Sequence, residues 1–136
     1  MDRSLHILLI DDDPEVGTTT QWALEEVGFI VSVVMSGEEG LHLQRAEPAD
    51  VVVTDIYMPE KDGIETIAEF REEFPHLPIV AISGGGPSGH ADDPLFVARE
   101  LGVHEVLRKP FDPKKLVEVI LEAARAGAGR GNGEAQ

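Results

Sequence analysis

The strongest constraint on this sequence is a repeated alternation between short apolar runs and segments with helical periodicity. Five apolar runs of strand length occur, and four of them are rich in valine and isoleucine at consecutive positions. They are Leu5–Ile10, Phe29–Val34, Val51–Thr54, Ile79–Ile82 and Val103–Leu107. Consecutive apolar residues are typical of strands buried on both faces. Right-handed crossovers then place helices on both sides of a parallel sheet, so the pattern predicts a doubly wound α/β fold.

Capping signals mark where the intervening helices begin. The five helices are expected to begin near Pro14, Gly37, Gly63, Pro94 and Pro113. Ser36 and Glu39 have the spacing of a capping box, in which each side chain accepts a hydrogen bond from the other residue's backbone amide. Gly28 and Gly102 are typical helix stops. We also expect Trp22 and Phe29 to lie in or near the core.

The length and charge of the chain restrict its function. Its 136 residues suffice for one domain, which we assign to residues 1–125, with a flexible glycine-rich tail at 126–136. The formal net charge of -15 repels phosphate backbones and anionic membranes, so we expect no direct nucleic-acid binding and no membrane insertion. The absence of cysteine excludes disulfides and thiolate metal sites. We find no signal peptide, and we expect a cytoplasmic protein.

Polar residues follow four of the predicted strands. Asp11–Asp13 follow the first strand, Asp55 the third, Ser83 the fourth and Lys109 the fifth. In open α/β sheets, ligands bind beyond the carboxyl ends of the strands. Clustered carboxylates repel one another unless a cation lies between them, and oxygen ligands favour Mg²⁺. With a lysine and a hydroxyl nearby, these groups suit phosphoryl transfer to a carboxylate.

Three motifs have a familiar combination and order. They are ILLIDDDP at 7–14, VTDIYMPEKDG at 53–63 and KPF at 109–111. With them the chain resembles the receiver domain of two-component response regulators over residues 5–125. The resemblance implies a flavodoxin-like, CheY-like sheet of five parallel strands in the order 2-1-3-4-5.

The same resemblance implies roles for the acidic residues. Asp55 is the expected phosphoacceptor. Asp11, Asp12 and Asp55 are the expected ligands of Mg²⁺, together with the backbone carbonyl of Tyr57. Apart from self-phosphorylation and autodephosphorylation at Asp55, no enzymatic activity is implied.

Two further site residues and the partners also follow from the resemblance. Ser83 is expected to donate a hydrogen bond to the phosphoryl group, and Lys109 to be its cationic partner, with a cis Lys109–Pro110 bond. The donor would be a sensor histidine kinase or a histidine phosphotransfer protein. Because only the glycine-rich tail follows the last helix, we expect a stand-alone receiver that signals by contact with a downstream protein.

Two alternative functions remain open. Val106 occupies the position, three residues before the lysine, where the family usually has tyrosine or phenylalanine. The receiver fold could therefore serve as an interaction module that phosphorylation does not mainly switch. In the second alternative, Asp11 and Asp13 would be the nucleophile and acid of a haloacid-dehalogenase-type phosphohydrolase, while in our first hypothesis Asp13 merely caps a helix.

Overall fold

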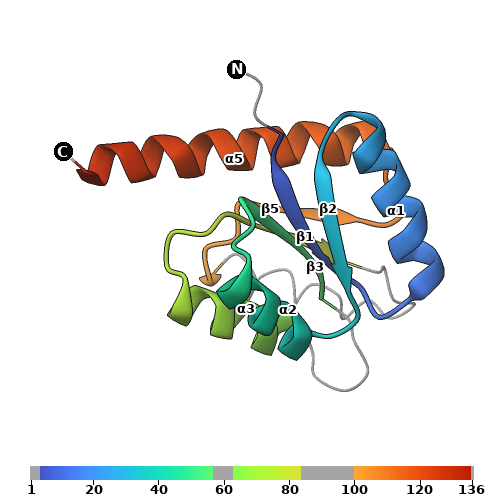
Figure 1. The fold of residues 1–136 in the computed structure, drawn as a ribbon, viewed down its shortest axis with the longest axis horizontal. Helices are drawn as coiled ribbons and strands as arrows, with labels where there is room; N and C mark the ends of the chain where they lie inside the picture. Colours follow the sequence, from blue (N-terminus) through green and yellow to red (C-terminus); the bar gives the residue numbers. More distant parts are fainter. Residues whose placement is uncertain (1–3, 57–62, 84–99, 136) are drawn as a thin grey trace.

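The chain folds into one open parallel sheet with helices on both faces (Figure 1). The computed structural model describes residues 4–56, 63–83 and 100–135. Its elements are β1 (His6–Ile10), α1 (Pro14–Glu26), β2 (Ile30–Val34), α2 (Gly37–Ala46), β3 (Val51–Asp55), α3 (Gly63–Glu73), β4 (Ile79–Ser83), β5 (Glu105–Arg108) and α5 (Pro113–Ala135). The strand order is β2-β1-β3-β4-β5, and all pairs are parallel. Both the fold class and the strand order are as predicted.

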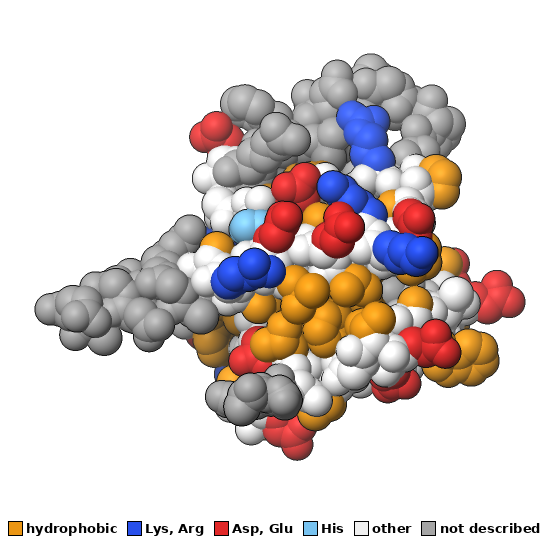
Figure 2. Space-filling model, turned by 90° about the horizontal axis from the view of Figure 1, so that it is seen from above, with side chains coloured by type: hydrophobic (Ala, Val, Ile, Leu, Met, Phe, Trp, Pro, Cys, Tyr) orange, Lys and Arg blue, Asp and Glu red, His pale blue; other side chains and the backbone are white. Residues whose placement is uncertain are grey.

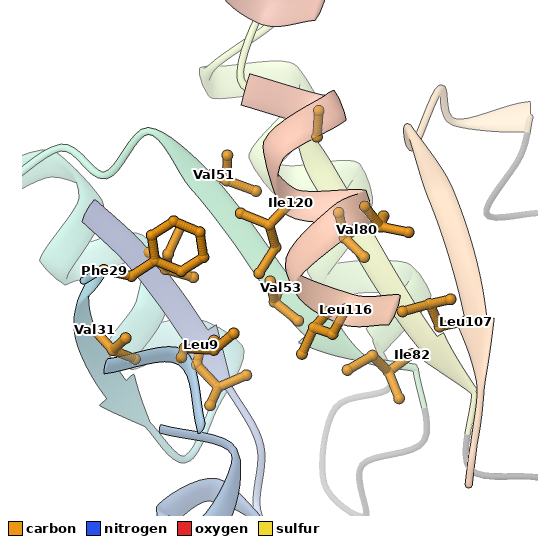
Figure 3. Packing of buried hydrophobic residues seen from close by; sticks show 14 residues of the cluster. Leu9, Phe29, Val31, Val51, Val53, Val80, Ile82, Leu107, Leu116 and Ile120 are labelled. Atoms are coloured by element: carbon orange, nitrogen blue, oxygen red, sulfur yellow. The ribbon is translucent and has the colours of Figure 1, made fainter. Parts of the chain in front are cut away.

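Two hydrophobic clusters, one on each face of the sheet, hold the helices in place. Helices α1 and α5 cover one face, where Leu116 and Ile120 of α5 lie against side chains of β3, β4 and β5 (Figure 3). Helices α2 and α3 cover the other face, where Phe70 is fully buried. Burying a large apolar side chain contributes about 1.5–3 kcal/mol. The central strands, buried on both sides, therefore fix the sheet edge at which the polar residues lie.

The predicted helix starts are confirmed for α1, α2, α3 and α5, with one correction at α2. Ser36 caps this helix by accepting a hydrogen bond from the Glu39 amide at 3.1 Å. The Glu39 carboxylate, however, accepts from the amide of Met35 at 3.0 Å rather than from that of Ser36. The side chain reaches one residue further back, so the capping box is not reciprocal. The predicted fourth helix begins within residues 84–99, which lie outside the described part of the chain.

The end of the chain differs from the predicted glycine-rich tail. Helix α5 continues through residue 126 as far as Ala135, so the backbone is helical within the segment that we assigned to the tail. Glycine within a helix costs about 1 kcal/mol relative to alanine, but the helix needs no new nucleus, because it propagates from the packed turns before it. The flexibility of residues 126–136 remains a prediction.

The prediction that Trp22 lies in or near the core is wrong. Its side chain on α1 is 66% exposed, whereas Phe29 is buried as expected. Seen from above, hydrophobic side chains gather in a patch beside a row of acidic and basic side chains (Figure 2). Apolar residues at helical spacing indicate that a helix has a hydrophobic face, but not that every large side chain lies on it.

Candidate functional site

Three carboxylates from two strand ends lie at the carboxyl edge of the sheet. Asp11 follows β1, and its amide donates to the carbonyl of Val34 at 3.0 Å, which continues the sheet ladder by one residue. Asp12 is next in the chain, and Asp55 is the last residue of β3. One ligand oxygen from each of the three carboxylates lies within 4.8 Å of the others. The parallel topology thus brings together residues more than 40 positions apart.

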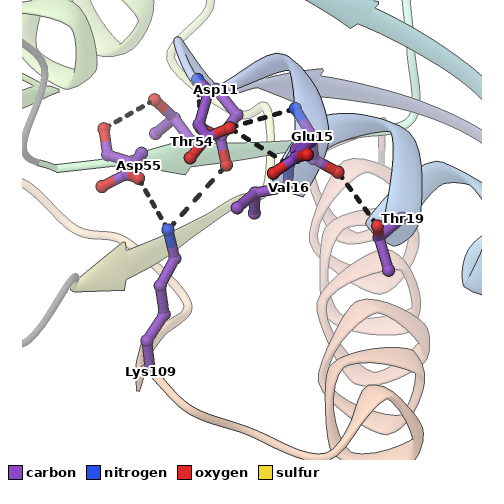
Figure 4. Close-up of polar contacts among 8 residues, drawn as sticks. Asp11, Glu15, Val16, Thr19, Thr54, Asp55 and Lys109 are labelled. Carbon is purple, nitrogen blue, oxygen red and sulfur yellow. Dashed lines mark hydrogen bonds and ion pairs between the residues drawn. The ribbon is translucent and has the colours of Figure 1, made fainter.

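Lys109 reaches this cluster from the residue after β5. Its Nζ lies 3.1 Å from Oδ2 of Asp55 and 3.9 Å from Oδ2 of Asp11 (Figure 4). The Lys109 amide donates to the carbonyl of Ser83 at 2.9 Å, which fixes the backbone beside β4. The Lys109–Pro110 bond is cis, as the resemblance implied. Burial lowers the pKa of Lys109, but the hydrogen bond to Asp55 and the charges of Asp55, Asp11 and Asp13 outweigh this effect, so the net pKa is raised.

The environment of Asp11 disfavours the charged form of its carboxylate. It is only 3% exposed, and burial raises its pKa. The hydrogen bond from the Asp13 amide, at 2.9 Å to Oδ1, and the charge of Lys109 oppose this rise, whereas Asp55 and Asp12 add to it. Among the described residues, the ammonium of Lys109 thus lies beside a cluster of three crowded carboxylates. A further cation would relieve the remaining repulsion.

The donor set fits a hard divalent ion. Asp11, Asp12 and Asp55 supply carboxylate oxygens only, and Asp12 is partly exposed, which leaves access to water. Mg²⁺ prefers oxygen ligands, keeps several waters and commonly binds one or two carboxylates beside a phosphate. The cluster could therefore hold such an ion. Tyr57, whose carbonyl was expected as a further ligand, lies outside the described residues.

Ser83 ends β4 next to the strand that carries Asp55. The register pairs Asp55 with Ile82, so Ser83 is one residue further along the neighbouring strand. Its side chain is fully buried, and its Oγ has no hydrogen-bond partner within the described part of the chain. A buried hydroxyl without a partner costs free energy, which an acceptor placed there would recover.

Two smaller groups complete the edge. The hydroxyl of Thr54 is buried and donates to the carbonyl of Asp55 at 3.2 Å, a contact that sequence reasoning missed (Figure 4). The sequence feature that could have indicated this contact is Thr54 itself, a polar residue within an apolar run. Asp13 is the N-cap of α1, accepting from the amides of Glu15 and Val16, as the capping hypothesis predicted. With its carboxylate engaged in this cap, Asp13 is poorly placed as a catalytic acid.

Comparison with known proteins identifies the class. The strand order and the acidic cluster at the carboxyl edge define a CheY-like α/β domain. A family model of the response regulator receiver domain matches residues 7–121. The chain belongs to this family of two-component signalling domains, which act mainly in signalling rather than as catalytic enzymes.

Individual relatives agree with this assignment. The transcriptional regulatory protein GlrR of Escherichia coli is 32% identical over 126 residues, which are 93% of this chain and 28% of GlrR. The alkaline phosphatase synthesis transcriptional regulatory protein PhoP of Bacillus subtilis is 31% identical, over 90% of this chain and 50% of PhoP. This chain therefore spans between about a quarter and a half of these relatives.

A solved receiver domain gives the same result at the level of the fold. The structure of a response regulator receiver domain protein from Clostridium thermocellum superposes with a TM-score of 0.80 and 30% identity, and the match covers 90% of this chain and 95% of that one. Among the described helices, none combines the length and hydropathy that a membrane span requires.

Proposed function

We propose that this chain receives a phosphoryl group on Asp55 from a phosphohistidine of a sensor kinase or of a phosphotransfer protein. The observation that carries the proposal is the crowding of Asp11, Asp12 and Asp55 opposite Lys109 at the carboxyl edge of the sheet. In the transfer, an oxygen of Asp55 attacks phosphorus. The bond between phosphorus and the donor's ring nitrogen breaks, and the nitrogen keeps the electron pair.

The charges around Asp55 fit this chemistry. When bound, Mg²⁺ would be held by Asp11, Asp12 and Asp55, with the carbonyl of Tyr57 as the expected further ligand, and it would neutralise charge on the transferred group. Lys109 already lies 3.1 Å from Asp55, close enough to turn to a phosphoryl oxygen after transfer.

The hydroxyl of Ser83 would donate a hydrogen bond to the transferred phosphoryl group. Its buried hydroxyl lacks a partner within the described residues, and a phosphoryl oxygen on Asp55 would supply an acceptor. Together, the hydroxyl and the Lys109 ammonium would bind a group that is absent before transfer. The state of Asp55 would therefore change contacts at the ends of both β4 and β5.

The partners and location follow from the same proposal. The donor is a histidine kinase or a histidine phosphotransfer protein, and the signal leaves by contact with a downstream protein. Direct binding to nucleic acid is opposed by the net charge of -15. A phosphoryl donor of this kind and the lack of cysteine both fit a cytoplasmic location.

The test is to incubate the protein with a small phosphodonor and Mg²⁺ and to map the modified residue by mass spectrometry. We expect one phosphoryl group on Asp55, none in Asp55→Asn, and normal uptake in Asp50→Asn, an exposed carboxylate outside the cluster. Modification of Asp11 instead would support the phosphohydrolase alternative. A folded protein that takes up no phosphoryl group would support the interaction module suggested by Val106.

A further inference from the structure

Arg71 on α3 donates hydrogen bonds to four backbone carbonyls in two separate turns. Its Nη1 donates to Pro75 at 2.8 Å and to Leu77 at 3.0 Å, both in the link between α3 and β4. Its Nε donates to Leu101 at 3.1 Å, and its Nη2 donates to Gly102 at 3.1 Å, in the turn before β5. A single partly buried guanidinium thus joins the entrances of two neighbouring strands.

Two of the bonded carbonyls, those of Leu77 and Gly102, occupy matching positions just before the two strands. The backbone ladder between β4 and β5 begins with the amide of His104 donating to Ile79 at 2.7 Å. Leu77 and Gly102 each lie two residues before these partners, which is one step of the parallel ladder. The two carbonyls cannot form a backbone hydrogen bond with each other, because neither is a donor. Arg71 bridges them by donating to both. The side chain therefore extends the register of the ladder by one step.

This register needs support because β5 is weakly held. It is an edge strand of four residues, Glu105–Arg108, paired only with β4, and Leu107 is its one buried side chain. A slip of one residue in a strand turns every side chain to the opposite face. Lys109 follows β5 directly, so its ammonium would move away from Asp55 with even a partial shift.

The turn before β5 has a shape that suits a guanidinium. Gly102 has a φ of 81°, a conformation that glycine adopts at little cost, and this conformation lets two successive carbonyls face Arg71. Arginine offers five donors in a fixed planar fork, whereas lysine is a single ammonium. Four carbonyl acceptors around one side chain therefore favour arginine.

We propose that Arg71 is a positioning residue that sets the register of β5 against β4 and thereby holds Lys109 at Asp55. It touches neither residue of the site and acts through the strand that leads to Lys109. The link to phosphoryl transfer rests on the function proposed above, but the positioning of Lys109 can be measured without any phosphodonor.

The first measurement follows the Lys109 side-chain amine and its Cε by NMR. The signal change caused by Asp55→Ala, which removes the acceptor, calibrates the loss of the contact at 3.1 Å. We expect Arg71→Gln and Arg71→Lys to reproduce a large part of this change. The control is Arg45→Gln, which removes an exposed arginine on α2 and should leave the Lys109 signal unchanged. Arg45 pairs with Glu73 of α3, the helix that carries Arg71, with Nη2 2.8 Å from Oε1.

The second measurement is the rate of phosphorylation by a small phosphodonor at a temperature where each variant is folded. Displacing a catalytic group by about 1 Å can lower a rate by as much as about a hundredfold, so we expect roughly a tenfold loss in Arg71→Gln and a smaller loss in Arg71→Lys. Arg45→Gln should react at the wild-type rate. If Arg71→Gln does not fold, Arg71→Lys carries both measurements.

The outcomes separate positioning from mere stabilisation. A lower melting temperature with an unchanged Lys109 signal in both Arg71 variants would overturn the proposal, because Arg71 would then only stabilise the fold. If wild-type protein takes up no phosphoryl group, the function proposed for Asp55 fails. The NMR comparison would still decide whether Arg71 positions Lys109.

Discussion

Replacing Asp55 by asparagine should stabilise the metal-free protein, although it removes an ion pair. At an effective dielectric constant of about 20, the attraction between Asp55 and Lys109 at 3.1 Å is about 5 kcal/mol. The repulsion from each of Asp11 and Asp12, with ligand oxygens within 4.8 Å, is about 3.5 kcal/mol or more. The two repulsions therefore exceed the attraction to Lys109 by about 2 kcal/mol.

Solvent reduces all of these energies, because Lys109 and Asp12 are partly exposed. Asparagine is nearly isosteric and still offers an oxygen to the Lys109 ammonium. We therefore expect a gain of about 1–2 kcal/mol in the free energy of unfolding, or about 3–8 °C in melting temperature for a domain of this size.

The assay is urea and thermal unfolding of wild type, Asp55→Asn and the control Glu118→Gln in a chelator. Glu118 is exposed on α5, so its change alters the net charge equally without touching the cluster. The Debye length at 0.1 M salt is about 10 Å, so salt should screen the effect of Glu118 but not that of contacts shorter than 5 Å. Millimolar Mg²⁺ should then stabilise wild type more than Asp55→Asn.

Two results would refute this reasoning. If Asp55→Asn is no more stable than Glu118→Gln without metal, the carboxylates do not repel one another in the folded state. If Mg²⁺ raises the melting temperature of both proteins equally, Asp55 is not among its ligands.

Four further outcomes are expected. Burial raises the pKa of Asp11, so the stabilisation from its protonated form is present below the ordinary pKa of 3.8 and is lost as the pH rises through the folded-state pKa. Unfolding of the metal-free protein between about pH 3 and about pH 7 should show this loss in wild type and not in Asp11→Asn. Asp12→Ala should abolish the rise in melting temperature on adding Mg²⁺. If the variant shows the same rise as wild type, Asp12 is not a ligand of the ion. Lys109→Ala should take up the phosphoryl group more slowly and show smaller amide NMR shifts on phosphorylation, whereas a full response would contradict its role. Hydrogen exchange in residues 84–95, which follow Ser83 and lie outside the described part of the chain, should slow on phosphorylation. Unchanged exchange would show that this segment does not respond to the state of Asp55.

Local patterns in the sequence were enough to predict the doubly wound α/β class, whereas the strand order came from the family resemblance. Each strand is a short apolar run, and the starts of α1 and α2 have capping residues, Asp13 and Ser36, that act within three positions along the chain. Such signals involve neighbouring residues only, so they survive without knowledge of the tertiary structure. Once the alternation is read, right-handed crossovers leave few ways to arrange the sheet.

The sequence also named the site residues, but the order of the motifs and the resemblance carried that step. Asp55 or Lys109 alone resembles an ordinary surface residue. Their contact at 3.1 Å joins positions 54 residues apart, and only the closed sheet brings them within reach. The pairing of Lys109 with Asp55 before any phosphoryl group arrives was not predictable from either motif.

Arg71 and Trp22 illustrate what only the tertiary structure decided. Arg71 lies in an ordinary helical segment of the sequence, yet its acceptors include carbonyls 30 and 31 positions away in a different turn. Trp22 lies exposed because packing of the neighbouring elements leaves its side of α1 uncovered. Periodicity and capping report interactions within one element, whereas register, exposure and the meeting of strand ends depend on contacts between elements, and these form only when the whole chain packs.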